Sequence, residues 1–285
     1  MMLYYPETLM DQWILDDVNQ GDLTTRVLGI GRKEGSITFF LKRPGRVSGV
    51  EAAEKVLRRL GLEITERTGD GTDVAAQSVL IGAAGKAEAL HQAWKVVQNI
   101  LEWSCGVAEY TAQMVYAVKQ VNPAIQVAAT RKNIPGTKLL ALAAILNGGG
   151  IIHRGGTGES ILLFADHRRF LDFAGTAEDW KGVIGHLRAG APEKKIILEA
   201  DTYCQAIAML DAEPDSIQLD TCNPETVAQV VEARNRRSRT CMIAVAGGLT
   251  KDNAPVYAAA GAQLIVSSAP YYAAPADVQV LLKPL

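Results

Sequence analysis

Charged side chains, glycines and serines follow most of the short apolar runs in the second half of the chain. They are Arg131 and Lys132, His153 and Arg154, Asp166 and His167, Glu199 and Asp201, Asp220, Gly247 and Gly248, and Ser267 and Ser268. In a parallel β/α barrel the carboxyl ends of all strands meet at one rim, where active sites are built. We therefore expect these side chains to converge on one site.

The first clusters predict a cationic half of this site, formed by Arg131, Lys132, His153 and Arg154. A guanidinium group binds a carboxylate or phosphate through two parallel hydrogen bonds, whereas a lysine acts as a point charge. An Arg-Lys pair after a strand is also common on solvated surfaces. If functional, this half suits an acid or a pyrophosphate group.

An anionic half is predicted from Glu199, Asp201 and Asp220. Carboxylates hold Mg²⁺ through one or two contacts while substrate oxygens fill its remaining positions. Glu199 lies within an apolar run, and an unpaired buried carboxylate is costly, which favours a functional acid over a structural one. We interpret Asp201 instead as the N-cap of a helix that starts at Tyr203.

Gly247-Gly248, between an expected strand and helix, would let backbone N–H groups meet a phosphate. Ser267 and Ser268 could donate hydroxyl groups to the same phosphate, although a Gly-Gly pair before a helix is also compatible with plain packing. A phosphate site, a metal site and a carboxylate clamp together predict a reaction between a sugar phosphate and an acid.

From residue 126 onward, short apolar runs alternate with helical segments. Runs are expected at 126–130, 150–153, 161–164, 195–199, 216–219, 241–246 and 263–266, with helices at 138–146, 177–187, 203–210, 224–234 and 252–260. Continuous apolar runs are typical of strands buried on both faces of a parallel sheet. The alternation fits a barrel or a doubly wound sheet, and the convergence of polar clusters favours the barrel.

The first part of the chain has a different, α+β texture. Its pattern predicts a helix at 6–18, a strand at 36–41, a helix at 50–60, strands near 62–65 and 79–83, and a long helix from 87 to 118 that breaks near Gly106. We therefore expect two domains, 1–105 and 106–270, with the tail 271–285 joining the first.

Composition narrows the class of protein. The 285 residues carry a net charge of -2, whereas nucleic-acid surfaces are basic, so a nucleic-acid partner is not expected. No apolar run reaches the ~20 residues of a membrane span, and the start lacks a secretory pattern, so we expect a cytoplasmic protein. The four cysteines form no CxxC pair, and neither HExxH nor GxxxxGK[ST] occurs.

Several segments resemble quinolinate phosphoribosyltransferases. The stretch Ala129-Thr130-Arg131-Lys132-Asn133-Ile134-Pro135-Gly136 is similar to that family's A-T-R-K-T-x-P-G, and glycines 148–150 with His153-Arg154 follow it. The segment 19–25 resembles G-D-x-T-T, and the segment 105–108 stands where S-G-I-A is usual. Leu198-Glu199, Leu219-Asp220 and 246–249 correspond to V-E, L-D-N and S-G-G-I. The similarity covers the chain in order.

This resemblance implies a phosphoribosyltransferase with an N-terminal α/β sandwich domain and an open, roughly seven-stranded parallel β/α barrel. It implies a homodimer with shared active sites that takes phosphoribosyl pyrophosphate, a heterocyclic acceptor and Mg²⁺. Arg131, Lys132, His153 and Arg154 would hold the acid and the pyrophosphate, with Lys132 stabilising the leaving group. Glu199 and Asp220 would act as catalytic and metal-binding groups, and Gly247, Gly248, Ser267 and Ser268 would bind the 5-phosphate.

Some positions depart from the family pattern. Trp94-Lys95 stands where the family has the arginine of E-R-T, which enters from the neighbouring subunit, and Phe164 stands where I-K-D-N-H places a substrate-binding lysine. The late T-H pair is Tyr271-Tyr272. We expect Lys95 and Phe164 to shape the acceptor end. These substitutions resemble the ModD branch, pyrophosphorylase-like proteins associated with molybdenum transport.

Three other functions stay open. The chain could be a true quinolinate phosphoribosyltransferase that makes nicotinate mononucleotide for NAD biosynthesis. It could use a neutral or monocarboxylate heterocycle, which Phe164 would favour by stacking. From a different class, it could be a non-catalytic binding protein for an anion such as molybdate.

Overall fold

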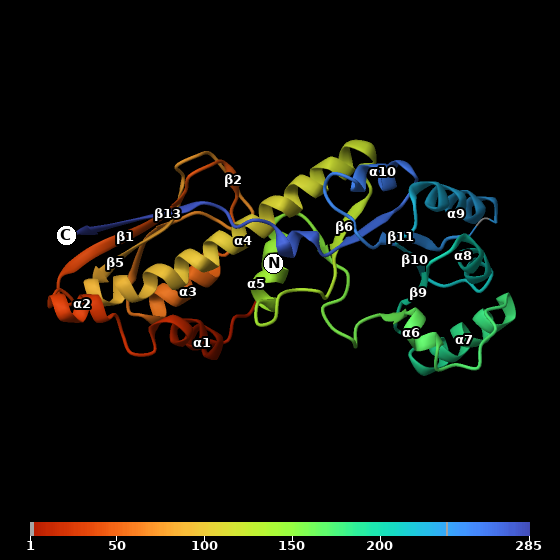
Figure 1. Ribbon diagram of the computed structural model, residues 1–285, viewed down its shortest axis with the longest axis horizontal. Coiled ribbons are helices and arrows are strands. Elements are labelled where there is room, and N and C mark those ends of the chain that lie inside the picture. Colours follow the sequence, from red (N-terminus) through yellow and green to blue (C-terminus); the bar gives the residue numbers. More distant parts are fainter. Residues whose placement is uncertain (1–2, 238) are drawn as a thin grey trace. The chain divides into compact units, whose positions relative to one another are not determined.

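The computed structural model describes residues 3–237 and 239–285, which form two compact units. Among the described residues, the first comprises 3–112, 133–149 and 270–285, and the second comprises 113–132, 150–237 and 239–269. Figure 1 labels the elements of both. Sequence patterns predict a division near residue 105, which lies in helix α4 (Ala87–Val121).

An antiparallel sheet forms one layer of the first unit, in the order β13-β1-β5-β3. Its strands are β1 (Glu34–Leu41), β3 (Glu63–Arg67), β5 (Val79–Lys86) and β13 (Val278–Pro284). Alternate residues of β1 are buried, as expected for a sheet with one face against a core. Helix α3 (Val50–Arg59) packs on β3 and β5, giving the expected α/β sandwich.

Shorter elements complete this unit. They are α1 (Glu7–Val18), α2 (Leu23–Leu28), α5 (Lys138–Asn147), the short strands β2 (Gly45–Arg46) and β4 (Asp73–Val74), and the 3-10 helix η1 (Ala269–Tyr272), which begins at the boundary. The pattern did not indicate α2. Its signal is local, because the Asp22 carboxylate accepts a hydrogen bond from Thr25 N–H and Gly29 ends the helix at a φ of 68°.

The expected break of the long helix near Gly106 is wrong, since α4 runs without interruption from Ala87 to Val121. Gly106 has a different reason to be glycine. A Cβ there would lie 2.3 Å from the carbonyl oxygen of Ala274. The missing side chain therefore admits the C-terminal tail, while one glycine within a long amphipathic helix is tolerated.

Seven strands form the parallel sheet of the second unit, in the order β7-β6-β12-β11-β10-β9-β8. They are β6 (Gln126–Ala129), β7 (Ile151–Ile152), β8 (Ile161–Leu163), β9 (Ile196–Ala200), β10 (Ser216–Asp220), β11 (Met242–Ala246) and β12 (Leu264–Ser267). All their pairings are parallel, and β7 and β8 are the two edges. This is the predicted open β/α barrel.

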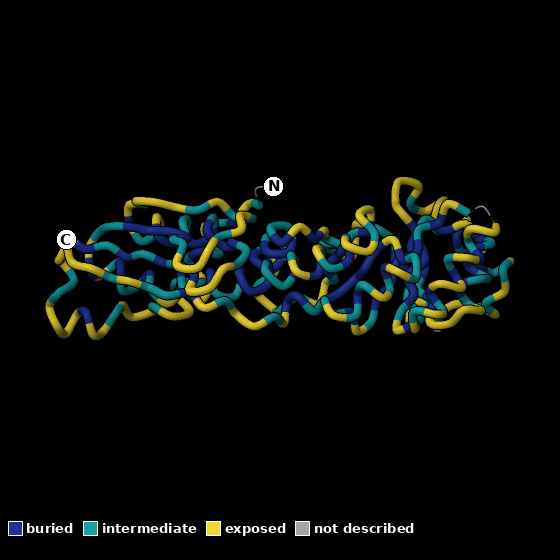
Figure 2. The backbone as a smooth tube through the Cα atoms, turned by 90° about the horizontal axis from the view of Figure 1, so that it is seen from above, coloured by how far each residue is buried: buried dark blue, intermediate teal, exposed yellow. Residues whose placement is uncertain are grey.

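Strands β9 to β12 are buried along nearly their whole length, which matches the continuous apolar runs of the sequence. Figure 2 shows buried stretches of backbone in dark blue between exposed turns. The accompanying helices are α6 (Ala165–Arg168), α7 (Ala177–Gly190), α8 (Tyr203–Leu210), α9 (Pro224–Arg236) and α10 (Ala254–Ala259).

The predicted N-cap role of Asp201 is wrong. Thr202 is the N-cap of α8, and its side chain accepts a hydrogen bond from Gln205 N–H. The Asp201 carboxylate lies 3.9 Å from Arg168 instead.

Within the described ranges, no helix has the length and apolar character needed to cross a membrane.

Candidate active site

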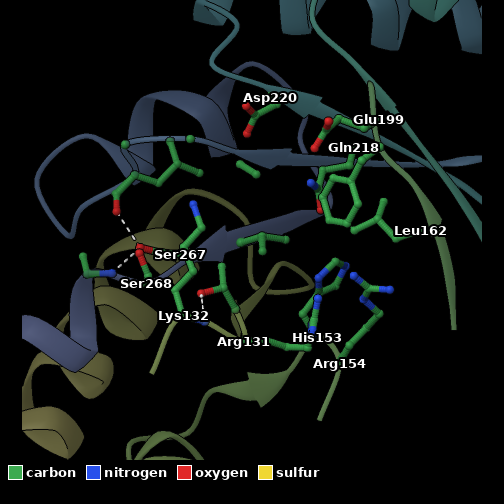
Figure 3. A pocket seen from close by; sticks show the side chains of 18 of the residues that line it. Arg131, Lys132, His153, Arg154, Leu162, Glu199, Gln218, Asp220, Ser267 and Ser268 are labelled. Carbon is green, nitrogen blue, oxygen red and sulfur yellow. Dashed lines mark hydrogen bonds between the residues drawn. The ribbon is translucent and has the colours of Figure 1, made fainter. Parts of the chain in front are cut away.

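A cavity of about 470 Å³ opens at the carboxyl ends of the barrel strands. Eleven of the predicted site residues line it, namely Arg131, Lys132, His153, Arg154, Phe164, Glu199, Asp220, Gly247, Gly248, Ser267 and Ser268. Figure 3 shows most of these side chains around one space. The convergence expected from barrel geometry is therefore present for these residues, whereas Asp166, His167 and Asp201, which were expected at the same site, do not line the cavity.

Gly247 directly follows β11, next to the carboxyl end of the neighbouring strand β10. Its φ is 88°, and a Cβ would lie 2.5 Å from Thr221 Oγ1 and 3.1 Å from an Asp220 carboxylate oxygen. A larger residue at position 247 would therefore collide with Thr221 and crowd the Asp220 carboxylate. Gly248 also has a positive φ, 65°, but a Cβ there would meet open space. The bare backbone of this turn faces the cavity.

The two serines differ in how their hydroxyl groups are used. Ser267 is 4% exposed, donates to the Leu249 carbonyl at 2.6 Å and accepts from Ala269 N–H at 3.0 Å. Its single hydroxyl proton is therefore used in the hydrogen bond that fixes the loop after Gly248. Ser268 also lines the cavity and is half-buried.

Glu199 and Asp220 stand at the ends of neighbouring strands, β9 and β10. Burial raises the pKa of Glu199 above its ordinary value, and the negative charges of Asp220 and Asp201 raise it further. A hydrogen bond from Ala165 N–H, at 3.4 Å, works in the opposite direction. Two carboxylates that repel each other in a cavity would be stabilised by a shared cation.

His153 does not contribute the positive charge predicted for it. Burial, reinforced by the neighbouring Arg154 guanidinium, lowers the pKa of His153 to about 4, so its imidazole is neutral at physiological pH. Arg154 is 7% exposed and donates to the Ser160 carbonyl at 3.3 Å. Arg154 is thus the buried cation of this end, and His153 offers a neutral ring.

Phe164 follows β8 and shapes the same end of the cavity. Its ring centre lies 5.6 Å from the Arg154 guanidinium and 5.7 Å from the His167 ring, with 23° between the two ring planes. Cation–π attraction favours the first contact. Arg154 therefore has an aromatic face beside it.

Arg131 and Lys132 follow β6 and are both exposed. The backbone is fixed here, because Lys132 N–H donates to Thr130 Oγ1 at 3.1 Å and Thr130 N–H donates to the Ser267 carbonyl at 3.1 Å. Figure 3 shows the Lys132 side chain rising toward the middle of the cavity. Because both side chains are exposed, these two cations are accessible to an anion that binds in the cavity.

The sequence patterns did not single out other lining residues, which are Thr130, Leu162, Gln218, Ala246, Leu249, Thr250, Val266 and Ala269. Of these additional lining residues, Gln218 is the polar residue that lies within a strand, β10. Alternation along β10 was the available signal, since Gln218 stands two residues before Asp220 and thus on the same face.

Lys95 is absent from the lining of this cavity and belongs to the first unit. Its ammonium donates to Gln98 Oε1 at 2.9 Å and lies 4.8 Å from the centre of the Trp94 ring.

No cluster of three or more potential metal ligands among His, Cys, Asp and Glu occurs in the described part of the chain. The pair Glu199 and Asp220 matches the chemistry of Mg²⁺, which needs few protein carboxylates when substrate oxygens supply the rest.

Two family models match nearly the whole chain. Residues 22–105 match the N-terminal domain of quinolinate phosphoribosyl transferase, and residues 107–281 match its C-terminal domain. An Escherichia coli O6:H1 protein named "Putative pyrophosphorylase ModD" is 48% identical over 283 residues, covering 99% of each chain.

More distant relatives agree. The nicotinate-nucleotide pyrophosphorylase (carboxylating) of Mycobacterium leprae is 30% identical over 259 residues, covering 89% of this chain and 88% of its own. The crystal structure of nicotinate-nucleotide pyrophosphorylase from Ehrlichia chaffeensis has the same fold, with a TM-score of 0.89 at 20% identity, covering 99% of this chain and 100% of its own. This chain therefore belongs to the quinolinate phosphoribosyl transferase family of phosphoribosyltransferase enzymes.

Proposed function

We propose that this enzyme transfers the phosphoribosyl group of phosphoribosyl pyrophosphate to a ring nitrogen of a heterocycle that carries an acid group, releasing pyrophosphate. The observation that carries the proposal is the meeting of two carboxylates, a bare glycine turn and two exposed cations around one cavity. A sugar phosphate with a pyrophosphate group needs each of these three features.

The 5-phosphate is assigned to the turn at Gly247 and Gly248 together with Ser268. Exposed backbone N–H groups and a hydroxyl bind phosphate oxygens without any net charge of their own. Ser267 supports this loop through Leu249, because its proton is already donated there.

Arg131 and Lys132 are assigned to the pyrophosphate. The bond between the anomeric carbon and the pyrophosphate oxygen breaks, and its electron pair leaves with the pyrophosphate. Cations aimed at this growing charge lower the barrier. Both side chains are exposed on a loop with a fixed backbone, so they can meet the substrate as it binds.

Glu199 and Asp220 face the sugar. The anomeric carbon becomes positively charged as the leaving group departs, and a carboxylate nearby stabilises that charge. A ring nitrogen of the acceptor then forms the new bond to this carbon. The same two carboxylates would hold Mg²⁺, which when bound neutralises charge on the pyrophosphate.

The acceptor end favours one acid group over two. Arg154 is the buried cation here, His153 is neutral, and an aromatic ring, Phe164, stands where the family pattern has a lysine. A second carboxylate would therefore lack a charged partner among these three side chains, and a flat ring could stack on the phenyl face. The alternative substrate, quinolinate, has two carboxylates.

We also propose a cytoplasmic homodimer in which Lys95 reaches the active site of the partner subunit. Support comes from the family pattern, where this position acts across subunits. We expect Lys95→Ala and Glu199→Gln each to lose activity alone, and the test mixes the two variants under conditions that allow subunits to exchange. Recovery of part of the activity on mixing supports a shared site, and no recovery contradicts it.

Transfer itself is tested by incubating the protein with phosphoribosyl pyrophosphate, Mg²⁺ and a panel of heterocycles, and analysing the products by mass spectrometry. The proposal expects an acceptor that has gained a phosphoribosyl group. Hydrolysis to ribose 5-phosphate with every acceptor would contradict it.

A further inference from the structure

Gln218 is a buried polar residue that faces the cavity. It is 4% exposed, and its Oε1 atom is buried without a hydrogen-bond partner among the described residues. Buried polar groups of folded proteins nearly always have partners, so an exception needs an explanation.

Strand register defines where this carboxamide lies. Gln218 pairs with Glu199 on β9 and with Ala244 on β11. Side chains at paired positions of neighbouring strands point to the same face. Gln218 therefore stands beside Glu199, and Figure 3 shows the two together at one side of the cavity.

The strand around Gln218 does not require a polar residue. Its neighbours Ile217 and Leu219 are fully buried, and the small residues Ala244 and Ala246 form the adjacent wall. An apolar side chain would fill this place without burying an unpartnered amide. The retained carboxamide, aimed into the substrate cavity, thus points to a ligand.

The surroundings restrict which ligand group can meet it. A carboxamide offers a carbonyl acceptor and an N–H donor side by side. The paired neighbour Glu199 is an acceptor when ionised, and Leu162 and Phe164 also line this cavity without any positive charge. The unpartnered atom is Oε1, an acceptor, so it requires a donor such as an N–H group. A carboxylate could meet only the Nε2 donor, and it would lie beside the ionised Glu199.

On the basis of the proposed function, we propose that Gln218 is a specificity-determining residue that hydrogen-bonds an amide-type edge of the acceptor heterocycle. The acceptor then carries an amide or lactam group, with N–H and C=O adjacent, in place of a second carboxylate.

The test uses matched acceptors, pyridine with two adjacent carboxylates and the two monoamides derived from it. Each is measured for kcat/KM and for equilibrium binding, with the wild type and with Gln218→Leu and Gln218→Glu. We expect the wild type to prefer at least one monoamide by about tenfold or more, because a site built for hydrogen bonding rejects analogues that lack the group.

Gln218→Leu should abolish this preference, and it should weaken the binding of the preferred monoamide far more than the binding of phosphoribosyl pyrophosphate, which meets the neighbouring Glu199. It should also raise the melting temperature of the ligand-free protein, because it removes an unpartnered amide. A structural glutamine would give the opposite shift. Gln218→Glu should weaken monoamide binding by adding a charge beside Glu199.

The inference is overturned if the dicarboxylate is preferred, if Gln218→Leu leaves the preference intact, or if none of the three acceptors binds. These results are distinct from failure of the proposed function, which is the absence of a phosphoribosylated product with every acceptor tried. Release with the dicarboxylate alone would overturn the inference and leave phosphoribosyl transfer standing.

Discussion

The Arg154 guanidinium lies 5.6 Å from the ring centre of Phe164, so the buried cation of the acceptor end stands beside an uncharged aromatic face. This pair limits how much negative charge the cavity can bind at that end. A heterocycle with one acid group would find the cation and a stacking surface.

Replacing this ring by a lysine should shift the enzyme toward a dicarboxylate. We expect Phe164→Lys to raise kcat/KM for quinolinate about 10- to 100-fold, since a hydrogen bond to a charged group contributes about 1.5–3 kcal/mol. Phe164→Leu is the control, because it removes the ring without adding charge. Equal gains in both variants, or none in the lysine variant, would contradict this account of the acceptor end.

The carboxylate pair should be essential for turnover but not for folding. We expect Glu199→Gln and Asp220→Asn each to reduce kcat about 100-fold or more while the protein stays folded. Steady-state kinetics and circular dichroism measure both properties. Near-normal turnover in either variant would remove that residue from the mechanism.

The sign of the pH effect follows from the raised pKa of Glu199. Its ionised form is less stable in the folded protein than in the unfolded chain, so stability is gained as pH falls through the folded pKa. Glu199→Gln should therefore melt at a higher temperature than the wild type at about pH 8, and the difference should shrink in acid. A lower melting temperature at that pH would show that Glu199 has a stabilising partner.

A neutral His153 makes a prediction about pH profiles. Because its pKa is lowered to about 4, the ratio of kcat/KM between wild type and His153→Gln should stay constant from about pH 5.5 to 8. Both profiles are measured in the same buffers. A ratio that changes several-fold through about pH 6.5, the ordinary histidine value, would show that the imidazolium acts in binding or catalysis.

The glycine turn offers a matched pair of variants. Gly247→Ala would place its Cβ 2.5 Å from Thr221, whereas Gly248→Ala meets open space at a similar positive φ. We expect Gly248→Ala to destabilise the protein by about 1 kcal/mol, the cost of a left-handed alanine, and Gly247→Ala by clearly more. Urea unfolding measures both, and the KM for phosphoribosyl pyrophosphate should rise most in Gly247→Ala. Equal effects in the two variants would contradict a close packing of Gly247 against β10.

Much of the barrel and its rim could be predicted because both depend on local patterns. Continuous apolar runs mark strands such as β10 and β11, and polar residues after them identify Glu199, Asp220 and the glycine turn as neighbours. The protonation state of an ionisable side chain at the rim depends on how deeply it is buried, and the sequence does not show that burial. The neutral state of His153 was missed for that reason.

Other differences arise from competing local and tertiary contacts. Asp201 and Thr202 both precede the helix that starts at Tyr203, and either type of side chain can cap a helix. Thr202 makes the capping hydrogen bond and has the extended backbone of an N-cap. Gly106 suggests a helix break by type alone, but its reason is the close approach of Ala274. Gln218 was overlooked because it sits inside an apolar strand, where its exposure to the cavity depends on the folded sheet.

The most direct test of the central claim is pyrophosphate release from phosphoribosyl pyrophosphate, followed with and without Mg²⁺ in the presence of quinolinate, its monoamides and other heterocycles. We predict release that requires both Mg²⁺ and an acceptor, and that is lost in Glu199→Gln. Binding of phosphoribosyl pyrophosphate or of molybdate without release from any acceptor would contradict transferase activity and favour a binding protein.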